Sequence, residues 1–449
     1  MPDPRSPQSP RIVAADIPVA SLDQDALRVI SRLQRNRFEA YLVGGCVRDL
    51  LLSRRPKDFD VATSAHPRQV KKLFENGRII GKRFRLVHVT FRGHIIETAT
   101  FRRAPQRNED DEGDLLIVDD NEFGSAEEDA RRRDFTINAL FLDPGRNEIL
   151  DYVGGLDDLD LGVLRTIGPA PVRMAEDPVR ILRAIKFATR LGFRIEEATW
   201  EAMCETAPEL ERSAKPRVLE EILRLARSGT ALGAFRMMRA CGALRAVLPQ
   251  IDDFLGPRSD PDPDAHDRAD TFWRLLEALD SDVHAGHVPT TAVCVATIFL
   301  RPIERAAGVD PRAHDAPAKE IELAAAEFLD PFAASVRLSR RDASKAIRII
   351  GAQQRFTAPL TRHSKPLTFA RSEGAREALD LFRLRSMAWG QGWDMYEGWV
   401  QRFEQARQAT PDQLAAEQKR GRRRGRRRRG SGGAKSGSGG ASARDAGAS

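Results

Sequence analysis

Two hydrophobic patterns divide this chain. Short apolar runs, typical of buried strands, recur up to about residue 153 and alternate with polar turns. From about Val163 onward, apolar residues instead recur every three or four positions, which is the period of an amphipathic helix. The pattern therefore predicts an α+β fold, in which a head containing a sheet is followed by an all-helical neck and body.

The predicted elements can be given by residue range. We expect a helix over residues 23–38, a helix opening at Val47, strands at Tyr41–Val43, Phe59–Ala62, Arg78–Ile80, Leu86–Phe91, His94–Thr100, Phe135–Leu142 and Glu148–Val153, and helices at Glu176–Leu191 and Arg217–Ala226. The acidic segment 108–129 is expected to be a flexible loop, because its like charges repel. A Pro/Asp-rich break at 256–270 predicts a loop between helices, and His266-Asp267 within it is taken as plain loop.

Composition shifts predict five regions. They are a disordered Pro-rich N-terminus (1–22), a sheet-containing head (23–160), a helical neck (161–230), a helical body (231–407) and a disordered Arg-rich tail (408–449). A Gly-Gly pair at Gly154-Gly155 marks the end of the sheet-containing part.

The positive charge of the chain is concentrated in one place. The formal net charge is +7 over 449 residues, but Lys419–Gly430 alone holds nine Lys and Arg and no acid. Such a run attracts phosphate backbones without reading their sequence. The other interpretation is a solubilising tail. Without this run the chain is slightly acidic, so the basicity is a local feature.

The remaining composition indicates a protein that stays in the cytoplasm. Four scattered cysteines form no CxxC pair, which argues against structural zinc and a disulfide framework and fits a reducing compartment. The N-terminus has no apolar signal region, and no stretch approaches eighteen continuous apolar residues. We therefore expect no membrane association.

A glycine turn followed by an arginine predicts a phosphate site. Gly44-Gly45 follows the predicted strand Tyr41–Val43, and a helix is expected directly afterwards. Glycines let the backbone approach a ligand closely, and backbone N–H groups at a helix N-terminus attract phosphate. Arg48 lies near that helix start and can add a charged fork.

Carboxylates downstream of this turn predict a magnesium site. Asp58 and Asp60 are spaced i,i+2, which on a strand places both side chains on one face. Glu97, on a later predicted strand, is a candidate third ligand; the alternative is a cross-strand ion pair with a nearby arginine. Acidic groups sharing a cleft repel unless a cation neutralises them. Two Mg²⁺ ions there could activate a 3′-hydroxyl and stabilise the charge on an α-phosphate.

The segment Arg131–Asn138 is a second candidate cluster. Its arginines, Arg133 among them, could meet triphosphate oxygens. Asp134 and Asn138 are spaced i,i+4 and could share a helical face that holds ribose hydroxyls. The alternative is a charged helix start capped by the aspartate.

A third cluster could read a nucleotide base. Asp177 suits a helix N-cap, with Pro178 at the first helical position. Asp177, Arg180 and Arg183 then follow at intervals of three and form one polar stripe, named here the selector stripe. A carboxylate and arginine forks distinguish amino from keto groups. Solvent-facing ion pairs along the helix are the alternative.

These motifs together resemble a known family. LVGGCVRDLLL, KDFDVAT, RRRDFTINAL, DYVGGLDDL and EDPVRILRAIKFATRLGF stand in the order found in class II nucleotidyltransferases, which include bacterial poly(A) polymerases and tRNA CCA-adding enzymes. The resemblance is strong over residues 23–229 and loose beyond. It implies a polymerase-β-like head, an all-helical neck and body, ATP as substrate, RNA 3′ ends as acceptors and a two-metal Mg²⁺ site.

The resemblance also assigns roles to single residues. Asp58 and Asp60 match the metal-binding pair, and Asp134 matches the carboxylate usually counted with them, with ribose contact as its alternative role. Positions that contact the nucleotide in the family are matched by Gly45, Arg48 and Arg133. The selector stripe matches the residues that hydrogen-bond the incoming base in place of a nucleic-acid template.

Within the family, the sequence favours the poly(A) polymerase branch. GKRFRLVHVTF at Gly81–Phe91 resembles the polymerase version of a segment that is Phe-Gly-Thr-like in CCA-adding enzymes. The segment leading into RRRDFTINAL and the basic tail agree with this. The alternatives are a tRNA CCA- or A-adding enzyme, a non-catalytic RNA-binding protein and a small-molecule nucleotidyltransferase. RNA-decay or RNA-chaperone partners could dock on the body or the tail.

Overall fold

The protein is seen in a computed structural model that describes residues 10–81, 85–103, 122–257, 263–309, 318–361 and 364–417. These residues form two compact units. The first unit extends to Ala269 and takes in two later stretches, Leu279–Val288 and Ser335–Arg337. The second unit holds the rest. The expected head, neck and first part of the body thus fall in one unit, and the finer boundaries between them stay predictions.

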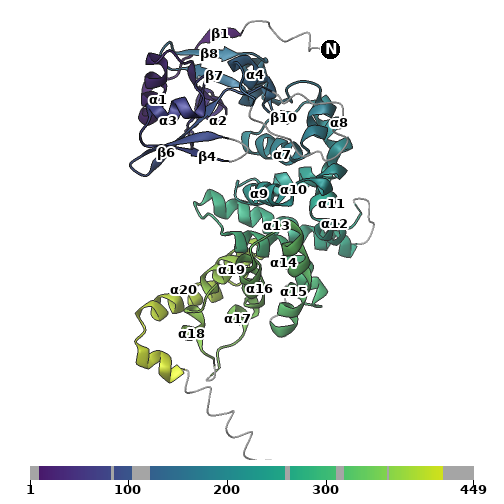
Figure 1. Cartoon of the computed structure of the whole chain (residues 1–449). Coiled ribbons are helices and arrows are strands. Elements are labelled where there is room, and N and C mark those ends of the chain that lie inside the picture. The colour runs from purple at the N-terminus through teal and green to yellow at the C-terminus, as the bar shows by residue number, and fades with distance from the viewer. Residues whose placement is uncertain are drawn as a thin grey trace, which may run out of the picture. The chain divides into compact units, whose positions relative to one another are not determined.

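An eight-stranded sheet forms the centre of the head (Figure 1). Its strands lie in the order β1 (Arg11–Ala14), β8 (Glu148–Asp151), β7 (Leu140–Asp143), β2 (Ala40–Val43), β3 (Asp60–Thr63), β6 (His94–Thr100), β5 (Leu86–Phe91) and β4 (Gly77–Ile80). Neighbouring strands are antiparallel except β3 and β6, which run parallel. The strands predicted at Leu86–Phe91 and His94–Thr100 are confirmed at both ends.

The central strands are apolar because both faces of the sheet are covered. Leu42 and Val61, on β2 and β3, are fully buried. Helix α1 (Gln24–Arg35) packs on these two strands through an apolar stripe, and Asp23 caps it by accepting hydrogen bonds from the N–H groups of Asp25 and Ala26. The helix expected over residues 23–38 is therefore confirmed.

The other short elements of the head connect the strands. They are η1 (Val19–Ser21), α2 (Gly45–Leu51), α3 (Pro67–Leu73), α4 (Ala126–Arg132), η2 (Thr136–Asn138) and α5 (Gly155–Asp160).

Helices dominate after the head, as predicted. The rest of the first unit holds a two-stranded parallel pair, β9 (Val163–Leu164) and β10 (Arg194–Ile195), and the helices α6 (Ala170–Glu176), α7 (Val179–Leu191), α8 (Glu197–Thr206), η3 (Ala207–Arg212), α9 (Lys215–Ala226), α10 (Ala231–Ala240), α11 (Ala243–Val247) and α12 (Pro249–Leu255). Helix α13 (Pro263–His284) is shared by the two units. The second unit holds α14 (Thr291–Ala306), most of α15 (Ala318–Val336), α16 (Arg340–Gly351), α17 (Gln353–Thr357), α18 (Pro366–Ala370), α19 (Ala375–Trp389) and α20 (Trp393–Gln408).

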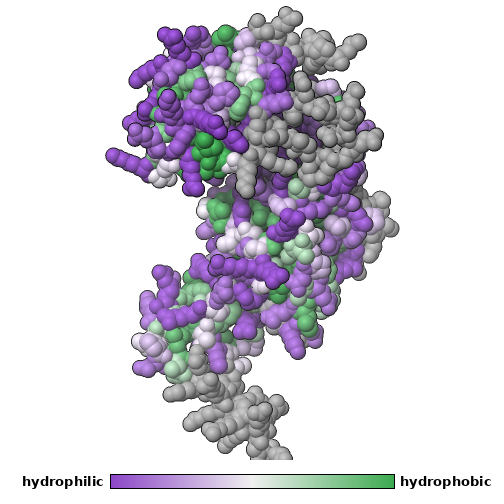
Figure 2. Space-filling view, in the orientation of Figure 1, coloured by the Kyte–Doolittle hydropathy of each residue, from purple (hydrophilic) through white to green (hydrophobic). Residues whose placement is uncertain are grey.

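Both units present a largely polar surface. On the face shown in Figure 2, hydrophilic residues prevail and apolar ones appear in small separate areas. Among the described helices, none combines the length and the apolar character that crossing a bilayer requires.

Three segments expected to lack structure contain ordered elements. Residues 11–14 of the expected disordered N-terminus form β1, which pairs with β8 along the sheet edge. The expected loop 256–270 gives way to α13 from Pro263 onward, so His266-Asp267 lies in a helix. Residues 411–417 of the expected tail are helical. These short segments carry no clear hydrophobic pattern in the sequence. Strand pairing and helix caps order them instead, so the positions of apolar residues alone do not predict them.

The acidic segment was also misjudged at its C-terminal end. Residues 104–121 lie outside the described part, but helix α4 begins at Ala126. Ser125 and Glu128 form a reciprocal capping box at its start. Acidic side chains are favourable in the first turn of a helix, because the N-terminal end of the helix dipole is positive. This favourable interaction with the helix dipole opposes the repulsion between like charges on which the loop prediction depended.

Candidate active site

The glycine pair lies where strand β2 ends and helix α2 begins. Gly44 has φ 76°, a conformation that favours glycine, and α2 begins at Gly45, two residues earlier than predicted. A Cβ atom on Gly44 would come within 2.9 Å of the Arg133 guanidinium. The turn therefore needs glycine for its backbone shape and for the close approach of Arg133.

Asp60 is a carboxylate without a partner. It is the first residue of β3, whereas Asp58 precedes the strand and is exposed, so the expectation that both lie on one strand is wrong. The pKa of Asp60 is raised to about 6, mainly by burial and then by the charge of Glu97; Arg133 acts in the opposite direction, and Asp58 adds the smallest contribution. Within the described residues, neither the Asp58 nor the Asp60 carboxylate makes a hydrogen bond or ion pair.

Glu97 has contacts that fit both of its expected roles. The parallel register that pairs Val61 with Thr98 places Asp60 beside Glu97 on neighbouring strands. Glu97 also lies directly across from His88, whose Nε2 is 3.4 Å from its carboxylate. The alternative expectation for Glu97 was a cross-strand ion pair with an arginine. A cross-strand pair is present, but the partner of Glu97 is His88 instead of an arginine. The assignment of Glu97 to the metal stays a prediction.

The carboxylates suit a metal that takes further ligands from its substrate. Across the described ranges, no three His, Cys, Asp or Glu side chains are grouped closely enough to hold an ion by themselves. Mg²⁺ usually binds one or two carboxylates and completes its shell with water and substrate phosphates. The unpartnered oxygens of Asp58 and Asp60 fit this requirement.

Arg133 is held in place beside Asp60. Its Nη2 donates to Asp129 Oδ2 at 2.9 Å and its Nη1 donates to the Asn138 carbonyl at 3.2 Å. The guanidinium also lies 5.3 Å from the centre of the Phe141 ring. Burial raises the pKa of Asp129, but Arg133 and Arg132 outweigh it and the net pKa is lowered. Arg133 is thus a preorganised cation at the metal side of the site.

Arg48 is buried, although we expected it to face a phosphate. It is 2 % exposed, and it donates to Asp49 Oδ1 from Nε at 2.9 Å and from Nη2 at 2.6 Å. Its Nη1 donates to the Asn138 side chain. These bonds use three of its five N–H groups, and a phosphate contact through the remaining two stays a prediction.

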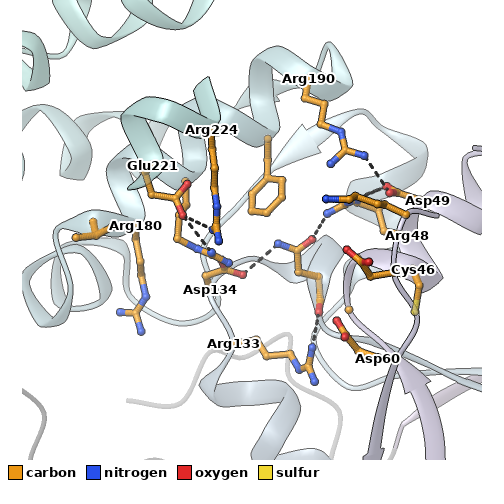
Figure 3. Close-up of a pocket in the computed structure, with 18 of the residues that line it drawn as sticks. Cys46, Arg48, Asp49, Asp60, Arg133, Asp134, Arg180, Arg190, Glu221 and Arg224 are labelled. Carbon is orange, nitrogen blue, oxygen red and sulfur yellow. Dashed lines mark hydrogen bonds and ion pairs between the residues drawn. The ribbon is translucent and has the colours of Figure 1, made fainter. Parts of the chain in front are cut away.

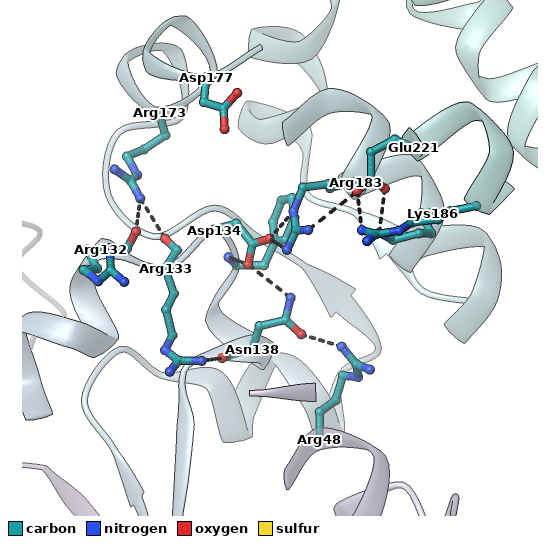
Figure 4. Close-up of polar contacts among 12 residues, drawn as sticks. Arg48, Arg132, Arg133, Asp134, Asn138, Arg173, Asp177, Arg183, Lys186 and Glu221 are labelled. Atoms are coloured by element: carbon teal, nitrogen blue, oxygen red, sulfur yellow. Dashed lines mark hydrogen bonds and ion pairs between the residues drawn. The ribbon is translucent and has the colours of Figure 1, made fainter. Parts of the chain in front are cut away.

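Asp134 binds an arginine of the selector stripe. Its Oδ2 accepts from Arg183 Nε at 2.9 Å and Nη2 at 2.6 Å, and its Oδ1 accepts from Asn138 Nδ2 at 3.1 Å. Burial raises the pKa of Asp134, but the charge of Arg183 outweighs it and the net pKa is lowered. Figure 4 shows the resulting chain of contacts from Arg48 through Asn138 and Asp134 to Arg183.

The stripe itself is fully engaged in ion pairs. Asp177 is the C-cap residue of α6, and Pro178 rather than Asp177 is the N-cap of α7; the Asp177 carboxylate accepts from Arg217 at 2.7 and 3.1 Å. Arg180 donates to the Arg173 carbonyl and lies 3.2 Å from Glu176. The stripe is therefore ion-paired, but its partners lie on other elements and its side chains are mostly shielded, so the expected alternative of solvent-facing pairs along one helix is wrong.

Helix α9 contributes residues that the sequence analysis missed. Glu221 is 4 % exposed, and it accepts from Lys186 at 2.6 Å and from Arg224 at 2.8 Å. Arg217, Glu221 and Arg224 recur at intervals of four and three, so they share one face. That spacing is visible in the sequence, but the prediction of this helix used only the spacing of its apolar residues.

Arg173 is a further residue that the sequence analysis did not identify. Its Nη2 donates to the carbonyls of Arg132 and Arg133 at 2.8 and 2.7 Å, and its Nη1 donates to Glu176 at 2.6 Å. It therefore ties the segment that carries Arg133 to the start of the selector stripe. No local sequence signal marks such a long-range contact.

Most of these groups line one pocket of about 710 Å³ (Figure 3). The expected residues found in its wall are Gly44, Gly45, Arg48, Asp58, Asp60, Arg133, Asp134, Asn138, Asp177, Arg180 and Arg183. Of the predicted set, only Glu97 is absent from the wall. The pocket thus brings together motifs that are more than a hundred residues apart in the sequence.

Family models match three parts of the chain. The model described as "Poly A polymerase head domain" matches residues 40–165, and "Probable RNA and SrmB- binding site of polymerase A" matches residues 192–255. A third, "Polymerase A arginine-rich C-terminus", matches residues 313–431.

Individual relatives agree with these models. Poly(A) polymerase I of Haemophilus influenzae is 41% identical over 251 residues, which cover 55% of this chain and 56% of that protein. A CCA-adding enzyme of Lactobacillus delbrueckii is 34% identical over 270 residues, covering 59% and 66%. The matched region thus spans somewhat more than half the length of the first of these relatives.

A solved structure extends the similarity to the fold. The Bacillus stearothermophilus CCA-adding enzyme in complex with CTP has a TM-score of 0.60 and 25% identity, covering 85% of this chain and 82% of that one. The motif order, the sheet-containing head, the helical remainder and the pocket all agree with these matches. The chain belongs to the nucleotidyltransferase family of bacterial poly(A) polymerases and CCA-adding enzymes.

Proposed function

We propose that this protein is a template-independent adenylyltransferase that adds AMP from ATP to RNA 3′ ends. The RNA 3′-oxygen forms a bond to the α-phosphorus of ATP, and the bond between that phosphorus and the bridging oxygen breaks to release pyrophosphate. The observation that carries the proposal is the pair of carboxylates without partners, Asp58 and Asp60, in the same pocket as the selector stripe.

Asp58 and Asp60 are the residues that would hold Mg²⁺. When bound, the metal supplies activation of the 3′-hydroxyl and stabilises the charge on the α-phosphate and pyrophosphate. The raised pKa of Asp60 supports this role, because an anionic carboxylate at that position is costly until a cation neutralises it. Glu97, beside Asp60, would add negative charge to the site.

The cationic groups of the pocket position the triphosphate. Arg133 is held by Asp129 and the Asn138 carbonyl, so little side-chain freedom is lost when it binds phosphate oxygens. The Gly44-Gly45 turn would let the triphosphate approach the backbone, and Asn138 would hold a ribose hydroxyl. Arg48 would keep Asn138 in the required orientation through its hydrogen bond.

The selector stripe would choose adenine. Asp177 can accept a hydrogen bond from the exocyclic amino group of adenine, and Arg180 and Arg183 can donate to ring nitrogens. Because these groups are paired in the structure, a base has to exchange hydrogen bonds with Arg217, Glu176 and Asp134. Such an exchange favours bases that replace every bond given up.

Poly(A) addition is favoured over CCA addition by the relatives and the tail. Poly(A) polymerase I from Salmonella typhi is 44% identical over 245 residues, compared with 42% over a shorter match of 206 residues for a Streptococcus mutans CCA-adding enzyme. The basic run Lys419–Gly430 suits an enzyme that accepts many RNAs. A tRNA CCA- or A-adding enzyme is the second candidate, supported by the fold of the CTP-bound structure.

An extension assay with each nucleotide separately tests the proposal. Purified full-length protein is incubated with Mg²⁺ and either a generic RNA or a tRNA lacking its 3′ end. We expect long A-tails on the generic RNA with ATP alone. A product limited to the CCA triplet on tRNA, or no Mg²⁺-dependent product at all, would overturn the assignment.

The cellular setting forms part of the same proposal. The four cysteines, all within the described residues, form no disulfide, as a reducing cytoplasm favours, and RNA polyadenylation during mRNA processing is the corresponding process. RNA-decay or RNA-chaperone partners would dock on the body or the basic tail. The family model over residues 192–255, described as a probable RNA and SrmB-binding site, supports a partner surface there.

A further inference from the structure

A second pocket lies in the second unit, beside helix α18. It has a volume of about 150 Å³, and its wall includes the apolar side chains of Leu360, Pro366, Phe369 and Trp399. It is named here the α18 groove. Its size is on the scale of one planar aromatic group, and no acidic side chain is among the residues that line it.

The walls of the α18 groove are already fixed. The indole N–H of Trp399 donates to the Phe356 carbonyl at 3.1 Å, and the ring packs edge-on against Phe356 and Phe369. Arg371 Nε donates to the Ala406 carbonyl at 2.8 Å and so ties α18 to α20, which lies beside it (Figure 1). A ligand would therefore meet a preformed surface, which reduces the entropic cost of binding.

Two cations of the groove lack an acidic partner. Arg355 and Lys365 both line it, and within the described residues neither forms an ion pair. The Arg355 guanidinium lies over the Phe369 ring, 5.2 Å from its centre. A guanidinium supported in this way is a flat, charged surface on which a nucleobase can stack.

The last described residue of the chain is bound to helix α18. Glu417, the last described residue, accepts hydrogen bonds from the N–H groups of Leu367 and Thr368 at 3.1 and 2.8 Å, and from the Thr368 hydroxyl at 2.6 Å. The run of nine positive charges begins two residues later, at Lys419. This basic run is not a favourable occupant of the groove, because the charged residues that line the groove are also positive. Groove and run instead attract the same kind of ligand, a polyanion.

We propose that the α18 groove binds a base of single-stranded RNA, stacked on Arg355, while a neighbouring phosphate meets Lys365. The assignment rests on the proposed function, which makes RNA the acceptor. Base stacking explains the apolar wall, and the phosphate charge explains the unpaired cations. An apolar peptide would use the wall but leave Arg355 and Lys365 without a counter-charge.

Binding of labelled RNA to the full-length protein tests the groove. Fluorescence anisotropy would compare a labelled oligo(A) with an abasic sugar–phosphate oligomer of equal length. We expect Arg355→Ala to weaken oligo(A) binding about tenfold, as loss of one stacked base predicts, and to affect the abasic oligomer much less. The matched control is Arg340→Ala, which removes an exposed charge of the same unit outside the groove and should change binding less than about twofold.

Arg355→Lys separates stacking from charge. It keeps the positive charge but has no flat face, so we expect oligo(A) binding nearer to that of Arg355→Ala than to wild type. Full restoration by lysine, or equal losses from Arg355→Ala and Arg340→Ala, would contradict the proposal. Cross-links from a photoreactive base to the peptide containing Arg355 and Phe369 would support it. AMP addition is scored separately, so an inactive wild type would overturn the proposed function and leave the binding comparison intact.

Discussion

The two sides of the candidate active-site pocket differ in whether their charged side chains have partners. On the side formed by the head, Asp58 and Asp60 carry carboxylates without partners, and the pKa of Asp60 is raised to about 6. On the side formed by α7 and α9, the charges of the selector stripe have partners, and the pKa of Asp134, which pairs with Arg183, is lowered. One side is therefore arranged to receive a cation, and the other to exchange hydrogen bonds that already exist.

This difference separates the two tasks of the enzyme. Unpaired carboxylates cost folding energy but bind a metal strongly when it arrives with the triphosphate. A paired stripe keeps its shape in the absence of nucleotide and admits only a base that compensates for each broken bond. The predictions below remove one element of this contrast at a time, from the largest expected effect to the smallest.

Removing both metal carboxylates should abolish catalysis. Asp58→Ala with Asp60→Ala is expected to lower the rate of AMP addition by a factor on the order of 10³ or more, because no other described carboxylate can take over both positions. Single-turnover kinetics on an RNA primer measure the loss. Glu148→Ala, an acidic residue of the same sheet outside the pocket, serves as the control. A double variant with near wild-type rate would remove the reaction centre from our account.

Removing Arg183 should destabilise the protein through Asp134. Arg183→Ala leaves a buried carboxylate without its counter-charge, at a cost of about 3 kcal/mol in the free energy of unfolding. Urea denaturation measures this. Adding Asp134→Asn should recover much of the stability but not the preference for ATP. Equal stability of wild type and Arg183→Ala would show that the pair is not coupled.

Neutralising Asp60 should stabilise the protein. The folded pKa of about 6 lies above the unfolded value near 4, so the native state binds more protons and stability falls as the pH rises between these values. Asp60→Asn is therefore expected to be more stable than wild type by about 1–2 kcal/mol at pH 7 without Mg²⁺. The gap should close as the pH falls from 6 to 4. A gap independent of pH would refute the raised pKa.

Removing Arg217 should change selectivity more than stability. Its pair with Asp177 is half exposed, so Arg217→Ala is expected to cost less than about 1 kcal/mol of unfolding free energy. Asp177 is then free to rotate, and we expect KM for ATP to change several-fold with kcat nearly constant. Arg212→Ala, which breaks another exposed ion pair, is the control. A change in kcat alone would instead implicate Arg217 in the chemical step.

The strands and the motif positions were predictable because they depend on local pattern. Alternation gave β5 and β6 at both ends, and the residue types at Asp58, Asp60 and Arg133 pointed to the pocket in which they lie. Hydrogen-bond partners were not predictable. The burial of Arg48 against Asn138 joins residues 90 positions apart, and no local pattern records such a contact.

The incorrect prediction for the start of the helix at Asp177 also arises because tertiary contacts leave no local signal in the sequence. Asp177 and Pro178 carry the residue types of a helix start, but α6 ends just before them and Arg217 takes the aspartate. Which of several plausible local structures forms is decided by tertiary contacts, here those of α9. The basic run Lys419–Gly430 and the segment 104–121 lie outside the described residues, so the structure does not test the predictions made for them.

Binding of a divalent ion to the head carboxylates is the most direct test. Mn²⁺, used as a spectroscopic probe, would be titrated by electron paramagnetic resonance in the presence of ATP, with wild type and Asp58→Asn plus Asp60→Asn compared at pH 5 and pH 8. We predict binding by the wild type that is stronger at pH 8, where Asp60 is ionised, and loss of that site in the variant. Equal Mn²⁺ binding by both proteins at both pH values would contradict the account.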